Sequence, residues 1–129
     1  MDSDKENFKF LLDYELRQCV RHRRYMSLVM MSLKNGHQKM IKVIRSRMRQ
    51  SDVVSFFEGF TLVLMADADK LEAVSAAARY GNDFDGCLDI RCSVSTFPDD
   101  GKTWNELSDV SQRRMKKAMK LNRGAVVAK

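Results

Sequence analysis

The sequence predicts an α+β fold, in which a four-stranded antiparallel sheet packs against helices. The first observation is a pair of β-rich runs, 52–57 and 60–65, that flank Glu58-Gly59 and are typical of a hairpin with a two-residue turn. The second is two further strand-like runs, 26–33 and 88–97. Helical patterns between these runs give the order β-α-β-β-α-β of a ferredoxin-like sandwich, and one extra helix is expected at each end of the chain.

The elements before the hairpin are predicted from the spacing of their apolar residues. A helix over 4–24 repeats them at intervals of three and four on one face. The apolar run 26–33 predicts a buried strand, and Asn35-Gly36 predicts the turn after it. A second helix is expected over 38–49. Because right-handed crossovers put the connecting helices on one face of the sheet, we expect the terminal helices to extend or flank that layer.

The elements after the hairpin are a helix, a strand and a last helix. An alanine-rich helix over 68–80 is expected to turn these residues inward: Leu71, Val74 and Ala78. The strand over 88–97 alternates, so one of its faces is expected to be open to solvent through these residues: Arg91, Ser93 and Ser95. Thr103 and Glu106 fit the capping box of the last helix. We expect a single domain over 1–129, with 1–6 and 124–129 frayed.

The bulk composition is that of a basic globular protein. Its 129 residues carry a formal net charge of +6, and basic residues cluster at 17–24, 42–49 and 113–123. Such clusters attract nucleotides, nucleic acid or acidic proteins, although they also fit the solvated faces of amphipathic helices. The start is not a signal peptide and no run spans a membrane, so we expect a cytoplasmic protein whose three cysteines are reduced and buried.

Three stretches, taken together over residues 8–124, resemble the GGDEF domain of bacterial diguanylate cyclases. The first runs from a helix with Glu15-Leu16 and basic residues into a strand with Ser27-Leu28. The second is Arg49-Gln-Ser-Asp52 followed by the hairpin. The third is Pro98-Asp-Asp-Gly101, which leads to Glu106-Leu107 and a lysine-rich helix that ends near Gly124. The resemblance implies the ferredoxin-like fold of these cyclases.

The departures from this family concern the residues that serve catalysis. Family members end the first strand with Asp-x-Asp, whereas this chain has Ser32 and Lys34 there, and an ammonium repels the divalent ions that the reaction needs. The signature Gly-Gly-Asp-Glu-Phe is reduced to Glu58-Gly59-Phe60, and the segment that grips the substrate between the first strand and the second helix is missing. Met119 stands where the family has a phosphate-contacting lysine. We therefore expect no cyclase activity, metal or cofactor.

One binding motif of the family remains. Arg49 and Asp52 match the Arg-x-x-Asp pattern that binds cyclic di-GMP as a product inhibitor, and Arg45 would add positive charge. A guanidinium can bind a guanine edge or a phosphate, and a carboxylate can accept from guanine N–H groups. A surface ion pair between the two residues is the alternative interpretation.

The predicted function is that of a non-catalytic regulatory domain in a bacterial signalling pathway, acting on another signalling protein or as a homodimer. The hairpin is the candidate interface, since strand alternation leaves one of Phe56 and Phe57 exposed beside these residues: Glu58, Gly59 and Phe60. A cyclic di-GMP receptor is the first alternative. A small nucleic-acid-binding domain is the second, and no membrane partner is expected.

Overall fold

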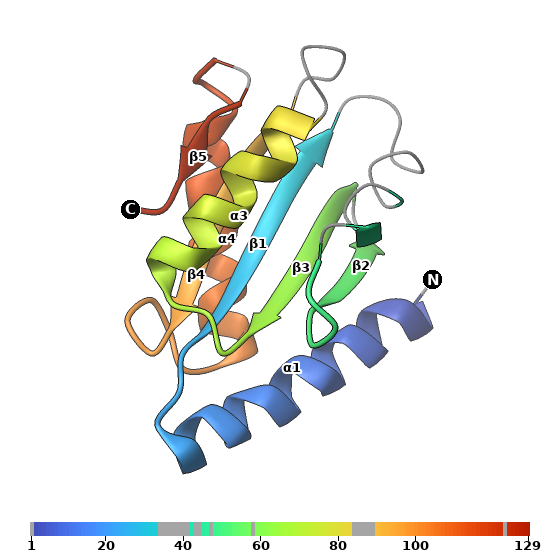
Figure 1. Cartoon of the computed structure of the whole chain (residues 1–129), viewed down its shortest axis with the longest axis vertical. Helices are drawn as coiled ribbons and strands as arrows, with labels where there is room; N and C mark the ends of the chain where they lie inside the picture. Colours follow the sequence, from blue (N-terminus) through green and yellow to red (C-terminus); the bar gives the residue numbers. More distant parts are fainter. Residues whose placement is uncertain are drawn as a thin grey trace.

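The computed structural model describes residues 2–33, 42, 45–46, 48–57, 59–83, 90–122 and 124–129 of the chain. These residues form a five-stranded sheet in the order β2-β3-β1-β4-β5, with α3 on one face and α4 on the other (Figure 1). The elements are α1 (Asp2–His22), β1 (Met26–Leu33), β2 (Val53–Phe57), β3 (Phe60–Ala66), α3 (Lys70–Asp83), β4 (Ile90–Phe97), α4 (Trp104–Ala118) and β5 (Val126–Val127).

The predicted α+β fold class is confirmed, with one additional strand. β1 lies at the centre of the sheet and pairs antiparallel with both β3 and β4, and β2 pairs antiparallel with β3. The fifth strand, β5, runs parallel to β4, which makes the sheet mixed. The tail was predicted to fray from Gly124, but the Gly124 N–H donates to the Ile90 carbonyl and Val126 pairs with Cys92. Backbone hydrogen bonds to the edge of β4 therefore order this end of the chain.

The two terminal helices cover the face of the sheet opposite to α3, which corrects the prediction that they extend or flank the layer of the connecting helices. One core lies between the sheet and α3, and includes Val29, Val63 and Val94. The other lies between the sheet and the pair α1 and α4, and includes Leu12 and Leu107. Both faces of β1 are therefore buried, as its continuous apolar sequence requires.

β4 alternates as predicted, but the face expected to be wet is buried. Ser93 and Ser95 lie under α4, where the Ser93 hydroxyl donates to the Ser111 carbonyl at 2.8 Å and the Ser95 hydroxyl lies 2.7 Å from the Ser111 hydroxyl. Arg91 donates from Nε to the Leu121 carbonyl at 3.0 Å. The small serines let α4 approach the sheet closely, and their hydroxyls are satisfied by the helix itself.

α3 contacts the sheet only partly through the predicted face: Val74 packs against the core as predicted, but the other two residues do not. Leu71 is 78% exposed and Ala78 is also exposed, whereas these residues are buried: Ala73, Ala76, Ala77 and Tyr80. The helix begins with a reciprocal cap, in which the Asp69 carboxylate accepts from the Glu72 N–H and the Glu72 carboxylate accepts from the Asp69 N–H. The alanines allow close packing, and Leu71 is left beside a groove on the surface.

The predicted hairpin is present. Phe57 pairs directly with Phe60, so only two residues join β2 to β3, and Gly59 has a φ of +80°. This left-handed conformation favours glycine, as a two-residue turn requires. Glu58 lies outside the described residues, and so does most of the predicted helix over 38–49.

The turn after β4 is fixed by an ion pair to α4. Asp100 binds Arg114 through two parallel hydrogen bonds of 2.7 and 2.8 Å, and Asp100 also accepts from the Thr96 N–H. The predicted cap is confirmed, since the Thr103 hydroxyl accepts from the Glu106 N–H. Burial by itself raises the pKa of Asp100, but the hydrogen bonds from Arg114 and Thr96 outweigh it, so the pKa of this carboxyl lies below its ordinary value.

We expect Asp100→Asn to lower the free energy of unfolding at pH 7 by about 2 kcal/mol, because it leaves Arg114 without its charged partner. A carboxyl with a lowered pKa in the folded state stabilises the protein above the ordinary value of 3.8, and this stabilisation is lost as the pH falls through the lowered value. The difference between wild type and variant in urea unfolding should therefore shrink in acid. The exposed Asp99→Asn is the control, and an equal loss in this control would contradict the assignment.

Candidate functional site

The end of β1 is the first candidate site, since the resemblance places catalytic carboxylates there and in the hairpin. Ser32 pairs with Phe60 on β3 and with Arg91 on β4. The fold therefore brings the strand end and the hairpin side by side, as in a site built from both. Lys34 and Glu58 lie outside the described residues.

The described residues at this strand end are poorly suited to a divalent cation. A hydroxyl on Ser32, an aromatic ring on Phe60 and a guanidinium on Arg91 occupy neighbouring positions on three strands. Mg²⁺ prefers carboxylate oxygens, and a nearby guanidinium repels it. Across the described part of the chain, no group of three or more His, Cys, Asp or Glu side chains is placed to hold a metal ion.

The second candidate site is the turn before β2, where Arg49 and Asp52 bind each other. The buried Asp52 carboxylate accepts from Arg49 Nε at 3.1 Å, from Nη2 at 2.9 Å and from the backbone N–H at 3.1 Å. Arg49 also donates to the Ala66 carbonyl, yet 43% of its side chain is exposed. The hydrogen bond to Asp52 raises the pKa of Arg49 above its usual value. Asp52 thus holds Arg49 in place, and the exposed part of Arg49 is what a ligand can reach.

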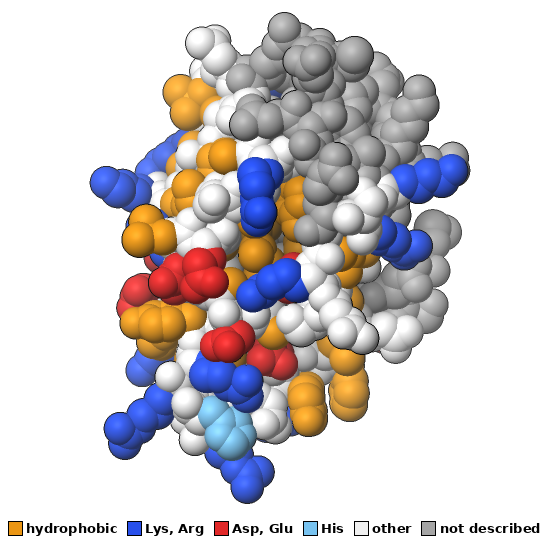
Figure 2. All heavy atoms as spheres, in the orientation of Figure 1, with side chains coloured by type: hydrophobic (Ala, Val, Ile, Leu, Met, Phe, Trp, Pro, Cys, Tyr) orange, Lys and Arg blue, Asp and Glu red, His pale blue; other side chains and the backbone are white. Residues whose placement is uncertain are grey.

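A groove of about 370 Å³ lies beside Arg49, between β3 and α3. Its wall includes a second guanidinium, Arg79, together with the exposed Leu71 and the carboxylate of Glu72. In Figure 2, Lys and Arg side chains stand beside α3 with hydrophobic surface between them. Two guanidiniums flanking an apolar surface suit a flat anionic ligand such as a nucleotide.

Arg79 was not among the residues predicted for this site. It enters the groove because α3 buries its alanines and turns Leu71 and Arg79 outward. Arg45, which was predicted to support Arg49, instead lines a separate hollow of about 410 Å³ beside β2. The rotation of α3 about its axis therefore places Arg79 beside Arg49.

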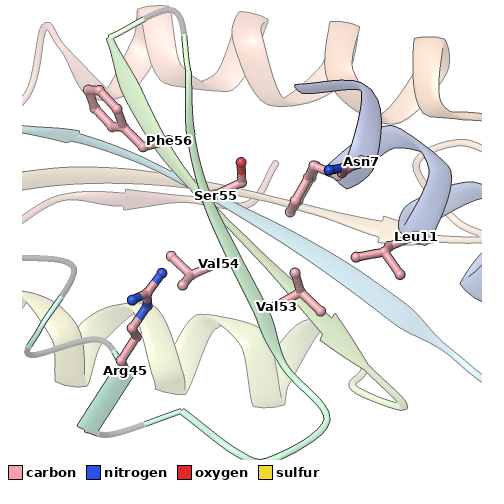
Figure 3. Close-up of a pocket in the computed structure, with 8 residues that line it drawn as sticks. Asn7, Leu11, Arg45, Val53, Val54, Ser55 and Phe56 are labelled. Carbon is pink, nitrogen blue, oxygen red and sulfur yellow. The ribbon is translucent and has the colours of Figure 1, made fainter. Parts of the chain in front are cut away.

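The hollow beside β2 lies where the edge of the sheet meets α1 (Figure 3). Val53 and Ser55 point toward Asn7 and Leu11 of α1, whereas Val54 and Phe56 point to the other side, where Arg45 lies (Figure 3). Phe56 is 38% exposed, which matches the prediction that one of the paired phenylalanines would be accessible. The side chain of Phe57 lies outside the described residues.

Neither cysteine that the structure describes is a reactive group. Cys19 and Cys92 are buried and reduced, as predicted, and Cys87 lies outside the described residues. Burial raises the pKa of the Cys19 thiol to about 11 and that of the Cys92 thiol to about 12, so both stay protonated near neutral pH. In the ranges that the structure describes, no helix combines the length and the hydrophobicity needed to cross a bilayer.

Comparison with known proteins identifies the fold. No family model matches the sequence, and no curated protein matches it either. The GGDEF domain of PA1120 (TpbB or YfiN) from Pseudomonas aeruginosa has a TM-score of 0.87 at 17% identity, over 95% of this chain and 87% of that one. The chain therefore has the fold of a GGDEF domain.

Two further structural neighbours are described together with an activator protein or with cyclic di-GMP. The diguanylate cyclase SiaD of Pseudomonas aeruginosa, solved with its activator SiaC, has a TM-score of 0.78 at 12% identity, over 96% of this chain and 57% of that one. A microbial GGDEF domain described as interacting with cyclic di-GMP has a TM-score of 0.73 at 12% identity, over 94% and 90% of the two chains. At these identities the likeness concerns the fold, and it leaves the function of this chain to be argued from its own residues.

We expect Arg49→Ala to lower the free energy of unfolding by about 2–3 kcal/mol, because it strands the buried carboxylate of Asp52. Arg79→Ala removes a side chain at the exposed wall of the groove and should change it by less than about 0.5 kcal/mol. Urea unfolding of the two variants measures both values. Equal effects would show that the Arg49–Asp52 pair is no more than a surface contact.

Proposed function

We propose that this chain is a non-catalytic GGDEF-like regulatory domain that acts through protein contacts in a bacterial signalling pathway. The observation that carries the proposal is that Ser32, at the end of β1, pairs with Phe60 on β3 and with Arg91 on β4. The strand end and the hairpin meet as in a cyclase, but the groups that meet there bring positive charge where a metal-bound triphosphate needs anionic ligands.

The hairpin supports the same conclusion by its length. Direct pairing of Phe57 with Phe60 leaves only Glu58-Gly59 for the turn, about two residues fewer than the signature loop of the family. A turn this short has one carboxylate at most to offer, whereas a triphosphate bridged by divalent ions needs several oxygen ligands. We therefore propose that substrate binding has been lost along with the signature.

Protein contact is proposed because apolar side chains stand exposed beside the hairpin. Phe56 on β2 and Leu11 on α1 border the same hollow, and two other apolar side chains of α1 are also exposed: Phe10 and Tyr14. Exposed apolar patches of this kind mark interaction surfaces. SiaD, which shares this fold, is found in complex with a protein activator, so partner binding is compatible with the fold.

The proposal predicts that the purified chain forms no cyclic di-GMP when it is incubated with GTP and Mg²⁺. Product is measured by mass spectrometry against a blank without protein, with an active diguanylate cyclase as the positive control. We expect the signal to equal the blank, because in the described residues no three or more His, Cys, Asp or Glu side chains are grouped to hold the ions. Product above the blank would overturn the proposal.

A cyclic di-GMP receptor is the second candidate function, and the groove beside Arg49 favours it. Arg49 and Arg79 supply two guanidiniums, and Leu71 supplies an apolar surface for a base. The carboxylate of Asp52 is less available to a ligand, because its oxygens already accept three hydrogen bonds from Arg49. A ligand would therefore bind to the outer part of Arg49 and to Arg79, with the ion pair kept intact.

If the chain is a receptor, calorimetry at about 100 μM cyclic di-GMP should detect binding, and Arg79→Ala should weaken it by about tenfold or more. Arg79→Ala is a better probe than Arg49→Ala, because the fold does not depend on it. The exposed Arg113→Ala on α4 is the matched control. Absence of heat with the wild-type chain would dismiss this function.

Nucleic-acid binding through an open sheet face is not supported by the geometry. The face of β4 that carries Ser93 and Ser95 is covered by α4, and the opposite face packs against α3. Ferredoxin-like RNA-binding domains stack bases on an exposed sheet. Within the described residues, basic helix faces alone remain for a phosphate backbone.

A further inference from the structure

A basic groove at the C-terminal end of α1 is not used by any of the functions above. It consists of two adjoining hollows, of about 520 and 290 Å³, that share Val20 of α1 and Lys102 of the loop before α4. The first also reaches the end of β4 at Phe97 and Pro98. The shared residues make the two hollows one continuous surface, which we call the α1 groove.

Every charged residue among the described residues that line the α1 groove is basic. The basic residues that line it come from α1, the segment after it and the loop before α4: Arg17, Arg21, Arg23, Arg24 and Lys102. The described residues that line the two hollows include no Asp or Glu. Lining cations without lining acids create a positive potential that a partner of opposite charge can match.

The floor of the α1 groove is apolar and partly open to solvent. Val20 is 67% exposed and Tyr25 is 47% exposed, although both lie beside the buried Cys19 and Phe97. The exposed Pro98 completes this surface. A hydrophobic side chain of a partner would bury the apolar surface of Val20 and Tyr25, and this burial would stabilise the complex.

Arg24 adds a polar requirement at the same place. Its Nε is buried and has no hydrogen-bond partner among the described residues. A buried donor without an acceptor is costly. Arg24 also lines the hollow, so a carboxylate that entered it would lie close to this guanidinium.

We propose that the α1 groove binds an acidic peptide segment of a partner protein, with an apolar side chain seated between Val20 and Tyr25 and carboxylates paired to the rim. Charge complementarity selects an acidic partner, and the apolar floor selects a peptide over a nucleic-acid backbone, because phosphates and sugars offer nothing to bury against Val20. The inference rests on the proposed regulatory function, for which it supplies a contact surface.

The test uses fluorescence anisotropy with the full chain and a labelled twelve-residue Glu/Asp peptide that carries a central Leu-Trp pair. We expect saturable binding that weakens about tenfold in the double variant Arg17→Glu, Lys102→Glu. The matched control is the double variant Arg113→Glu, Lys116→Glu on α4. Each replacement lowers the net charge by two, so both double variants have a net charge of +2 instead of +6. Equal weakening in both pairs would overturn the proposal, because it would show a general effect of net charge.

The apolar floor is tested separately by Val20→Ser, with Leu121→Ser as an exposed control away from the groove. Binding should weaken in the first variant and stay unchanged in the second. Tighter binding of a twelve-residue oligothymidylate, or equal binding of a peptide whose Leu-Trp pair is replaced by Ser-Ser, would contradict a peptide site. Absence of peptide binding alone sinks only this inference, whereas formation of cyclic di-GMP sinks the regulatory function itself.

Discussion

The register of β1 at the centre of the sheet is the constraint on which the other features depend. At one end, the Ser27 hydroxyl donates to the Ala68 carbonyl at 2.9 Å and lies 2.8 Å from the Thr96 hydroxyl, which ties β1 to β4 and to the start of α3. At the other end the same register places Ser32 between Phe60 and Arg91. A slip by one residue would exchange the two buried faces of β1, so both ends are fixed together.

Two carboxylates in this basic protein serve to hold the fold. Asp52 fixes Arg49 and the turn before β2, and Asp100 fixes Arg114 and the turn after β4. In both cases an aspartate with little exposure binds an arginine, which is the geometry that makes an ion pair matter for stability. Other basic residues that the structure describes lie at the surface, among them Arg79, the group around the end of α1, and Arg113 and Lys116 on α4. This distribution suits contact with anions and acidic partners better than it suits holding Mg²⁺.

Local signals could be predicted from the sequence, and packing between distant elements could not. The two-residue turn before Phe60 and the sequence order of the first four strands follow from residue type and periodicity, which act over short stretches. The burial of Ser93 depends on Ser111, a residue of the next helix, so strand alternation alone suggested a wet face. Both faces of α3 carry apolar residues, and the prediction that Leu71 faces the sheet was wrong because the smaller Ala73, Ala76 and Ala77 pack there instead. For the same reason Arg79 could not be assigned to the groove in advance.

The claim that this domain holds no metal-bound triphosphate is tested most directly by a crystal structure. The crystals are grown with Mg²⁺ and a non-hydrolysable GTP analogue at about 1 mM, far above the dissociation constant expected of a working substrate site. We expect no ordered triphosphate or ion at the end of β1 or at the β2–β3 turn, because Ser32 and Arg91 offer no anionic ligand there. Density for a triphosphate that an ion bridges to Ser32 or Glu58 would contradict the claim that this domain works without catalysis.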